Sequence, residues 1–288
     1  MKRMIALLLA LVLLNAPAAL ASPVTVLKSS QVPAFDEETP VLKVYFFNIH
    51  ARDSFLLECG GETMLIDCGG YNYGSSFIAP KLEKLGIRHI DYAVNTHPDD
   101  DHICGFISLL DSVTVGTFYT CFPEDYNEYQ NQTLRALKKH DVPVVALTED
   151  TDLSFGGLTI WTYQDWDTFS TNSRSLVMHV SFGDSAVLFM GDTTSDVHDA
   201  LAAEKGEAIR ADLFKVAHHG INKPTDEMFK LVNPKYAVIT NNHTDMIDRT
   251  VQFLNRHNCP VLYTVRGCVE CVTDGREWKI RQMDYDRF

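Results

Sequence analysis

Four short apolar runs in this chain each end in side chains that commonly bind metal ions, and this pattern constrains the fold more than any other feature. Such runs are typical of buried β-strands. The carboxyl ends of parallel strands meet at one edge of a sheet, which is where α/β proteins place their sites. We therefore expect the four following segments to lie together. The runs and their following segments are Ile90–Asn95 with Thr96 to His102, Ala186–Met190 with Gly191-Asp192, Leu213–Val216 with Ala217 to Gly220, and Tyr236–Thr240 with Asn241 to His243.

The order of the other segments indicates an α/β fold of layered sheets and helices in one domain. Two strand-like runs flank Gly60-Gly61 and predict a β-hairpin, and later strand-like runs alternate with segments of helical apolar spacing. No internal repeat or low-complexity tract is visible. We expect a signal peptide over residues 1–21, a linker or loosely docked N-terminal arm over residues 22–40, and the folded domain over residues 41–288.

The first residues have the organisation of a secretory signal peptide. Met1–Arg3 is positively charged, Met4–Leu14 is apolar, and Ala19 to Ala21 supplies small residues for cleavage near Ala21. The alternative, an uncleaved membrane anchor, needs roughly 20 apolar residues. The apolar stretch is shorter than that and is followed by Pro17. We expect a secreted or extracytoplasmic protein with no stable membrane insertion after the signal is cleaved.

The charge balance argues against one class of partner. The sequence holds 38 Asp and Glu residues against 25 Lys and Arg residues, a net charge of −13. Without Lys2 and Arg3 the counts are 38 and 23, so the mature charge is −15. A chain this acidic is not expected to hold a polynucleotide mainly through a basic surface. Nothing in the sequence identifies a protein partner.

The seven cysteines leave several interpretations open. An exported chain permits disulfides, although an odd number leaves at least one thiol unpaired. Cys268 and Cys271 have the spacing of half a zinc ribbon, but they also fit a disulfide or two buried thiols. Cys59 and Cys68 are candidates for a disulfide across the predicted hairpin.

The densest group of ionisable side chains follows the first run, where two imidazoles and three carboxylates fall within six residues, 97–102. Carboxylates at such close range do not all ionise cheaply without a cation. A divalent metal is the usual solution, because histidine nitrogen and carboxylate oxygen are its ordinary ligands. The alternative is an acidic surface loop with two incidental histidines. Asp192, His218, His219 and His243 at the other strand ends favour the metal site, whereas His179 within a strand fits a core residue better than a ligand.

With these residues in view, the sequence resembles the metallo-β-lactamase superfamily, whose signature loop is H-x-H-x-D-H. The loop here reads His97-x-Asp99-x-Asp101-His102, and this variant resembles the hydrolase-like domain of bacterial competence (DNA-uptake) proteins and their stand-alone secreted relatives. The resemblance extends from about Val41 to Lys279. Further matching segments are Phe47 to Ser54, which keeps the family's Asp-Ser but not its glycines, Leu65 to Gly70, Asn172 to Val177, Met190 to Asp192, and Lys215 to Gly220.

The resemblance implies a four-layer αβ/βα sandwich with a metal site at one edge of the facing sheets. It also implies one or two Zn²⁺ or Mn²⁺ ions per chain. The family has a further ligand histidine that lacks a clear counterpart here, unless His179 or Asn172 serves, and its Gly-His-Pro segment is absent. By resemblance, His97 and Asp99 hold one metal, Asp101 and His102 hold the other, Asp192 bridges, His218 or His219 completes the shell or donates a proton, and His243 takes the last ligand position.

The function implied is a secreted metal-dependent hydrolase of phosphodiester bonds, acting on a small or a polymeric substrate with metal-activated water as nucleophile. Asp101 would orient that water, and whichever of His218 and His219 is not a ligand would protonate the leaving oxygen. A carboxylate in place of the second histidine makes the site harder, which favours phosphate esters over lactams. Two alternatives stay open, a lactonase or β-lactamase-type hydrolase and a non-catalytic metal-binding module. The aromatic residues within 118–129 and 161–169 either line the mouth of the site or pack in the core and loops.

Overall fold

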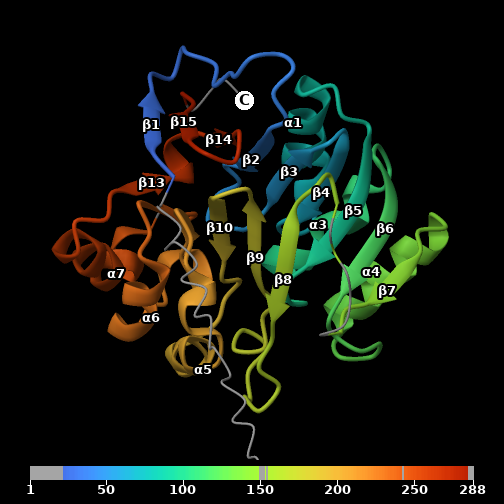
Figure 1. The fold of residues 1–288 in the computed structure, drawn as a ribbon. Helices are drawn as coiled ribbons and strands as arrows, with labels where there is room; N and C mark the ends of the chain where they lie inside the picture. Colours follow the sequence, from blue (N-terminus) through green and yellow to red (C-terminus); the bar gives the residue numbers. More distant parts are fainter. Residues whose placement is uncertain (1–21, 149–152, 154, 242, 285–288) are drawn as a thin grey trace, which may run out of the picture.

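The structure is a computed structural model and describes residues 22–148, 153, 155–241 and 243–284, so the expected signal peptide lies outside it. Within these residues the strands form a nine-stranded sheet, in the order β1-β15-β14-β2-β3-β4-β5-β6-β7, and a six-stranded sheet, in the order β13-β12-β11-β10-β9-β8 (Figure 1). The strands are β1 Val24–Leu27, β2 Leu42–Phe46, β3 Phe55–Cys59, β4 Glu62–Ile66, β5 His89–Asn95, β6 Thr114–Thr120, β7 Val144–Ala146, β8 Thr159–Tyr163, β9 Val177–Phe182, β10 Ser185–Phe189, β11 Leu213–Lys215, β12 Tyr236–Ile239, β13 Val261–Tyr263, β14 Val269–Thr273 and β15 Trp278–Gln282. The α-helices are α1 Ala79–Lys84, α2 Asp100–Ile103, α3 Gly105–Leu109, α4 Glu128–Lys139, α5 Ser195–Lys205, α6 Asp226–Val232 and α7 Thr244–Arg256.

The two sheets pack face to face because alternate residues along their strands are apolar on the facing side. In β2, Val44 and Phe46 point into the core between the sheets, whereas Tyr45 points to the outer face of the larger sheet. Val187 and Phe189 of β10 supply the other side of the same core. The alternation therefore fixes which face of each strand is inside.

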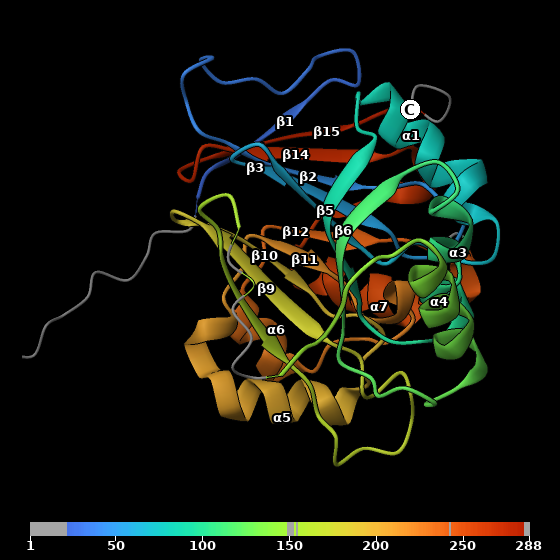
Figure 2. The same ribbon diagram turned by 90° about the vertical axis from the view of Figure 1, so that its right-hand side faces the viewer.

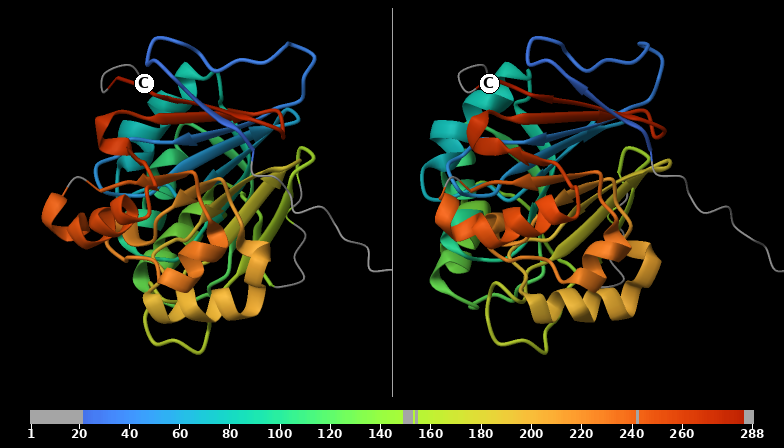
Figure 3. Two further views of the ribbon diagram at one scale, coloured as in Figure 1. Left: turned by 60° about the vertical axis from the view of Figure 1, so that its left-hand side comes forward. Right: turned by 90° about the vertical axis from the view of Figure 1, so that its left-hand side faces the viewer.

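Helices cover the outer face of each sheet. Leu82 of α1, Phe106 of α3 and Leu137 of α4 pack against the larger sheet, on the side shown in Figure 2. Leu201 of α5 and Phe253 of α7 pack against the smaller sheet. Figure 3 shows these helices from the opposite side. The architecture is the four-layer αβ/βα sandwich that the family resemblance implied.

The structure adds two strands that the sequence analysis missed. β1 lies inside the expected arm of residues 22–40 and pairs in parallel with β15, so part of that arm belongs to the larger sheet. β15 returns antiparallel to β14, which in turn pairs with β2. The predicted hairpin around Gly60-Gly61 is present as β3 and β4.

All seven cysteines lie in the described part of the chain and are free thiols. Cys271 faces the core between the sheets, and Cys268 faces the helix layer on the other side of the larger sheet. Cys59 and Cys68 are divided between the same two faces. Neither pair can form a disulfide through a sheet, so the predicted disulfides were wrong, as was the zinc site at Cys268 and Cys271. These two cysteines are buried thiols, which was the third alternative.

The strand directions bring the chemistry to one end of the sandwich. β4, β5 and β6 are parallel neighbours, and so are β10, β11 and β12. The polar segments that follow them therefore leave the two sheets side by side at one edge. None of the helices in the described part of the chain has both the length and the apolar character that a membrane span requires.

Candidate metal centre

The carboxylate of Asp192 lies at the centre of a group of histidines. Its Oδ2 is 3.9 Å from Nε2 of His97 and 3.3 Å from Nε2 of His102, which come from the segment after β5. The same oxygen is 3.6 Å from Nε2 of His218 and 3.5 Å from Nε2 of His219, which follow β11. Three strand ends therefore meet around one oxygen atom, as the strand-end pattern predicted.

Several atoms of this group are buried without a hydrogen-bond partner. They are Nε2 of His97, His102 and His219 and Oδ1 of Asp192. Each such atom costs free energy unless something binds it. Three convergent imidazole nitrogens and a carboxylate oxygen form the ordinary donor set of a divalent transition metal. The residues present therefore fit a metal ion, and without one the site carries four unmet polar atoms.

The remaining carboxylates of the segment after β5 lie at the rim of this group. Oδ2 of Asp99 is 3.7 Å from Nε2 of His97, and Oδ1 of Asp101 is 3.9 Å from Nε2 of His102. Oδ2 of Asp101 is also 3.2 Å from Nε2 of His219. The neighbours match the division implied by resemblance, in which His97 goes with Asp99 and His102 with Asp101.

The two adjacent histidines after β11 have different surroundings. His219 is 3% exposed, whereas the side chain of His218 is 29% exposed and reaches solvent. Both adopt positive φ angles, 50° for His218 and 54° for His219, a conformation that non-glycine residues adopt rarely and at a cost. The strained turn directs both rings toward Asp192. Because His219 is buried and His218 reaches solvent, His219 is the better internal ligand and His218 the better proton donor.

A buried carboxylate holds His102 from behind. Oδ2 of Asp67 is 2.8 Å from Nδ1 of His102, so the ring turns its Nε2 toward Asp192. Asp67 also accepts hydrogen bonds from the Nδ2 of Asn95 and from the backbone N–H and hydroxyl of Thr96. All of these donors are neutral. A carboxylate that orients a ligand histidine raises its basicity and fixes its tautomer.

A second buried carboxylate holds His219 in the same manner, with one difference. Oδ1 of Asp53 is 3.0 Å from Nδ1 of His219 and accepts from the hydroxyl of Thr240 at 2.7 Å. Its Oδ2 forms an ion pair with Nζ of Lys215, which is fully buried. One ligand atom from each of Asp53, His102, Asp192 and His219 lies within 4.8 Å of the others. Because Lys215, Thr240 and His219 already use its oxygens, we assign Asp53 to orientation rather than to metal binding.

Neither Asp53 nor Asp67 was among the site residues predicted from the sequence, although both stood in the family-like segments. Asp67 follows β4 directly, so the strand-end rule would have included it had the hairpin been treated as part of the parallel set. Asp53 precedes β3, and only the tertiary structure brings it beneath His219, 166 residues away. The local sequence carries no signal for that contact.

The main chain around Asp192 is held from two sides. Its N–H donates to Oγ of Ser175 at 3.1 Å, and Nδ2 of Asn222 donates to its carbonyl at 3.3 Å. Gly191 has a φ of 52°, and a Cβ at this position would lie 2.7 Å from Cβ of Ser175. Glycine is therefore required for the close approach that aims Asp192 inward.

The pKa values follow from burial and crowding. Burial and the neighbouring His102 lower the pKa of His97 to about 3, which keeps its ring neutral and able to bind a metal. Burial alone would lower the pKa of His219, but Asp192 and Asp53 raise it to about 9. Burial raises the pKa of Asp99 to about 6. Although burial opposes it, the imidazoles of His102 and His219 hold the pKa of Asp192 well below its usual range.

Three residues considered in the sequence analysis lie apart from this group. His243 is exposed at the N-terminus of α7, and within the described residues it forms no ion pair with the carboxylates of the site. His179 faces the helix layer of the smaller sheet, where its Nε2 lies 2.8 Å from the carbonyl oxygen of Arg210 and its ring stacks on Trp161. Asn172 is half-buried in the loop between β8 and β9. In this structure neither His243 nor His179 is positioned as a ligand, because their side chains leave the sheet at other places.

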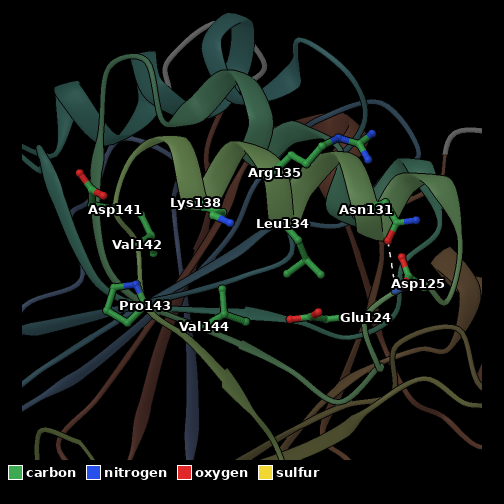
Figure 4. A pocket seen from close by; sticks show the side chains of 10 residues that line it. All are labelled: Glu124, Asp125, Asn131, Leu134, Arg135, Lys138, Asp141, Val142, Pro143 and Val144. Carbon is green, nitrogen blue, oxygen red and sulfur yellow. Dashed lines mark hydrogen bonds between the residues drawn. The ribbon is translucent and has the colours of Figure 1, made fainter.

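A cavity of about 570 Å³ lies away from the metal ligands, between α4 and the segment leading into β7 (Figure 4). The side chains that line it are Glu124, Asp125, Asn131, Leu134, Arg135, Lys138, Asp141, Val142, Pro143 and Val144. None of the histidines or carboxylates around Asp192 is among them. The hollow is therefore separate from the candidate metal centre.

Comparisons with known proteins agree with this geometry. Residues 49–243 match the family model described as the metallo-beta-lactamase superfamily. Competence protein ComA of Neisseria gonorrhoeae is 24% identical over 193 residues, which cover 67% of this chain and 26% of the relative. ComE operon protein 3 of Bacillus subtilis (strain 168) is 26% identical over 231 residues, covering 75% and 29%. This chain thus spans less than a third of the length of these two relatives.

Two solved structures show the same fold. The metallo-beta-lactamase fold protein YhfI from Bacillus subtilis superposes with a TM-score of 0.54 at 17% identity, covering 78% of this chain and 96% of that one. CmlA, a diiron beta-hydroxylase from Streptomyces venezuelae, superposes with a TM-score of 0.50 at 17% identity, covering 84% and 55%. At this identity the likeness concerns the fold alone.

Proposed function

Because this chain belongs to the metallo-β-lactamase superfamily, whose members are mostly metal-dependent hydrolases, we propose that it is a metal-dependent phosphodiesterase. The observation that carries the proposal is the position of Asp192 Oδ2, with four imidazole Nε2 atoms 3.3–3.9 Å away. Three of those nitrogens are buried without a hydrogen-bond partner. A buried donor set of this kind has no structural use without a cation.

The residues that would hold the metal divide into two groups that share Asp192. His97 and Asp99 form one group, and Asp101, His102 and His219 form the other. A bound divalent ion supplies a Lewis acid and lowers the pKa of coordinated water toward neutrality. Zn²⁺ and Mn²⁺ both suit a mixture of imidazole and carboxylate ligands. Carboxylate oxygens are harder ligands than imidazole nitrogens, so the three carboxylates shift the preference toward Mn²⁺, the harder of the two ions.

The remaining chemistry falls to two side chains at the solvent edge. The side chain of Asp101 is 31% exposed and can accept a hydrogen bond from the attacking water, which turns a lone pair of the water toward phosphorus. His218, whose ring reaches solvent, can take a proton from bulk water and deliver it to the leaving oxygen. Burial lowers the pKa of His218, so its protonated ring is a stronger acid than a free imidazolium and releases its proton more readily.

Phosphodiesters are preferred over lactams and lactones because of the charge of the site. Asp99, Asp101 and Asp192 place three carboxylates around the expected ions. A site rich in hard oxygen ligands favours hard metal ions, which in turn prefer hard oxygen atoms in the substrate. A phosphodiester offers anionic oxygens to such ions, whereas a neutral amide or ester offers a single carbonyl. We also propose that the protein acts outside the cytoplasm, because its first 21 residues resemble a secretory signal peptide.

The test combines metal content with hydrolysis. Purified protein should contain one or two divalent ions per chain and should hydrolyse bis(p-nitrophenyl) phosphate faster than p-nitrophenyl phosphate. Asp192→Ala should lose both metal and activity, whereas Asp199→Ala, which removes an exposed carboxylate of α5, should lose neither. Equal hydrolysis by the wild type and Asp192→Ala would refute the proposal. If a chromogenic cephalosporin or a lactone is hydrolysed faster than the phosphodiester, the protein is a lactamase-type or lactonase-type hydrolase instead. A content of less than about one metal ion per chain would indicate a non-catalytic module.

A further inference from the structure

Exposed apolar side chains gather at the end of the sandwich that carries the metal centre. Eight large apolar residues of the described chain are more than a third exposed, and five of them lie on segments that leave the sheets at this end. Tyr71 follows β4, Tyr129 starts α4 after β6, and Met246 starts α7 after β12, while the other two lie in the loop between β8 and β9. These two are Trp166, which is 44% exposed, and Phe169, which is fully exposed.

Five aromatic residues in these segments form two groups, which together we call the aromatic ridge: Tyr71 with Tyr129, and Phe122 with Tyr126 and Trp166. The ring centroids of Tyr71 and Tyr129 are 6.3 Å apart. Those of Phe122 lie 4.7 Å from Tyr126 and 5.4 Å from Trp166. Tyr126 and Tyr129, one from each group, flank Asn127, the N-cap of α4.

The aromatic ridge is tied to the metal-binding segments at two points. Nδ2 of Asn127, the N-cap residue in its middle, donates to the carbonyl of Pro98 at 2.8 Å. Pro98 stands between His97 and Asp99. At the other end, the loop that carries Trp166 runs into Ser175, whose Oγ accepts from the N–H of Asp192. The ridge therefore borders the metal centre.

Arg174 lies at the Trp166 end of the ridge. The guanidinium carbon of Arg174 lies 5.2 Å from the ring centroid of Trp166, and its Nε donates to the carbonyl of Thr168 at 2.9 Å. Within the described residues, the carboxylates lie beyond ion-pair distance of this guanidinium, and Arg174 directly precedes Ser175. In a chain with a net charge of −13, a half-buried arginine without an acidic partner beside the centre is positioned to meet an anion.

Resting on the proposed function, we propose that Trp166, Arg174 and the aromatic ridge bind the ester group that the reaction leaves on phosphorus, and that this group contains a flat aromatic ring. Stacking on the exposed rings of the ridge, above all Trp166, recognises the aromatic ring, whereas Phe122 is buried and packs against Trp166. Arg174 pairs with a phosphate oxygen. A cationic alcohol fits less well, because a guanidinium already occupies the face of Trp166 where such a cation would bind.

The same arrangement favours short substrates. A long polyanion is held by many lysines and arginines that displace its counterions, and this site places Arg174 among several carboxylates. Stacking works without such a basic surface. The substrate class is therefore a short phosphodiester with an aromatic ring next to the scissile phosphate.

The experiment compares two esters that share a leaving group, bis(p-nitrophenyl) phosphate and methyl p-nitrophenyl phosphate. The wild type should favour the aryl ester in kcat/KM by about tenfold, the effect of one aromatic stack. Trp166→Ala should remove this preference through KM, and Trp166→Phe should keep most of it. Arg174→Met should raise KM for both esters alike. The matched controls are Tyr263→Ala and Arg266→Met, which break a similar cation–ring pair with a separation of 4.6 Å on and beside β13.

The outcomes separate this inference from the proposed function. If the wild type hydrolyses both esters but Trp166→Ala keeps the preference, the inference is wrong and the proposed function stands. If the wild type hydrolyses neither ester, the proposed function fails, and calorimetric binding of phenyl phosphate and methyl phosphate decides the inference. A preference for phenyl phosphate that is lost in Trp166→Ala supports the subsite, and equal binding overturns it.

Discussion

The buried ion pair between Lys215 and Asp53 allows a quantitative prediction for Lys215→Met. Lys215 is fully buried in β11, and its Nζ lies 5.6 Å from the ring centroid of Phe55. Methionine keeps most of the apolar stem but leaves Asp53 as a buried carboxylate without its cation. Removing one partner of a buried ion pair costs about 3–5 kcal/mol. We expect the free energy of unfolding of the metal-free protein to fall by about this amount.

The double variant tests whether Lys215 acts through Asp53. Asp53→Asn alone should cost a similar amount, because it leaves the ammonium unpaired. Lys215→Met with Asp53→Asn removes both charges and should cost several kcal/mol less than the sum of the single changes. Urea unfolding followed by circular dichroism, after dialysis against a chelator, measures all four proteins.

Lys235→Met serves as the matched control. Nζ of Lys235 lies 3.9 Å from Oδ1 of Asp212, and the side chain of Lys235 is 28% exposed. Asp212 also accepts from the N–H of Ala186 and from Nε1 of Trp278, so its charge stays partnered. A loss of about 0–1 kcal/mol is expected. If Lys215→Met costs no more than this control, or if the two single costs add up in the double variant, the reasoning is refuted.

Three further predictions follow from the site. Asp67→Asn should weaken Zn²⁺ binding by about 10–100-fold, because His102 loses the carboxylate that orients it, and competition with a chromophoric chelator measures the change. In metal-free protein the raised pKa of His219, about 9, contributes stability that is complete below the unfolded value near 6.5 and is lost as pH rises through 9; urea unfolding should show this fall, and a His219→Gln variant with the same fall would contradict it. Gly191→Ala should destabilise by about 1–3 kcal/mol more than Gly61→Ala, because both have positive φ but only at Gly191 does the added Cβ meet another residue, at 2.7 Å; equal melting temperatures would argue against the steric account.

Much of the fold followed from the sequence. The alternation seen in Val44, Tyr45 and Phe46 already separates an inner from an outer face, because successive side chains of a strand point to opposite sides. The hairpin at Gly60-Gly61 is also local, since its turn residues are adjacent in the chain. β1 was missed because it is a short run, Val24–Leu27, within a polar, proline-containing segment, and its partner β15 lies about 250 residues later.

The sequence also determined the neighbourhood of the candidate site. His97, His102, Asp192, His218 and His219 each follow a strand, and parallel strands must release their following segments at one edge. The same rule placed His243 in the site by mistake. It follows β12, but the chain turns directly into α7 and leaves its side chain exposed. Position after a strand locates a residue near an edge and does not fix the direction of its side chain.

Only the tertiary structure decided which residues support the ligands. Asp53 reaches His219 across 166 residues, and Asp67 reaches His102 across 35. The difference between His218 and His219, adjacent in the chain, likewise depends on which ring packs against Asp53 and which reaches solvent. Apolar periodicity and strand ends are properties of neighbouring residues, so a sequence reports them directly. The partners of a buried charge depend on how distant strands align, and that alignment exists only once the two sheets have packed together.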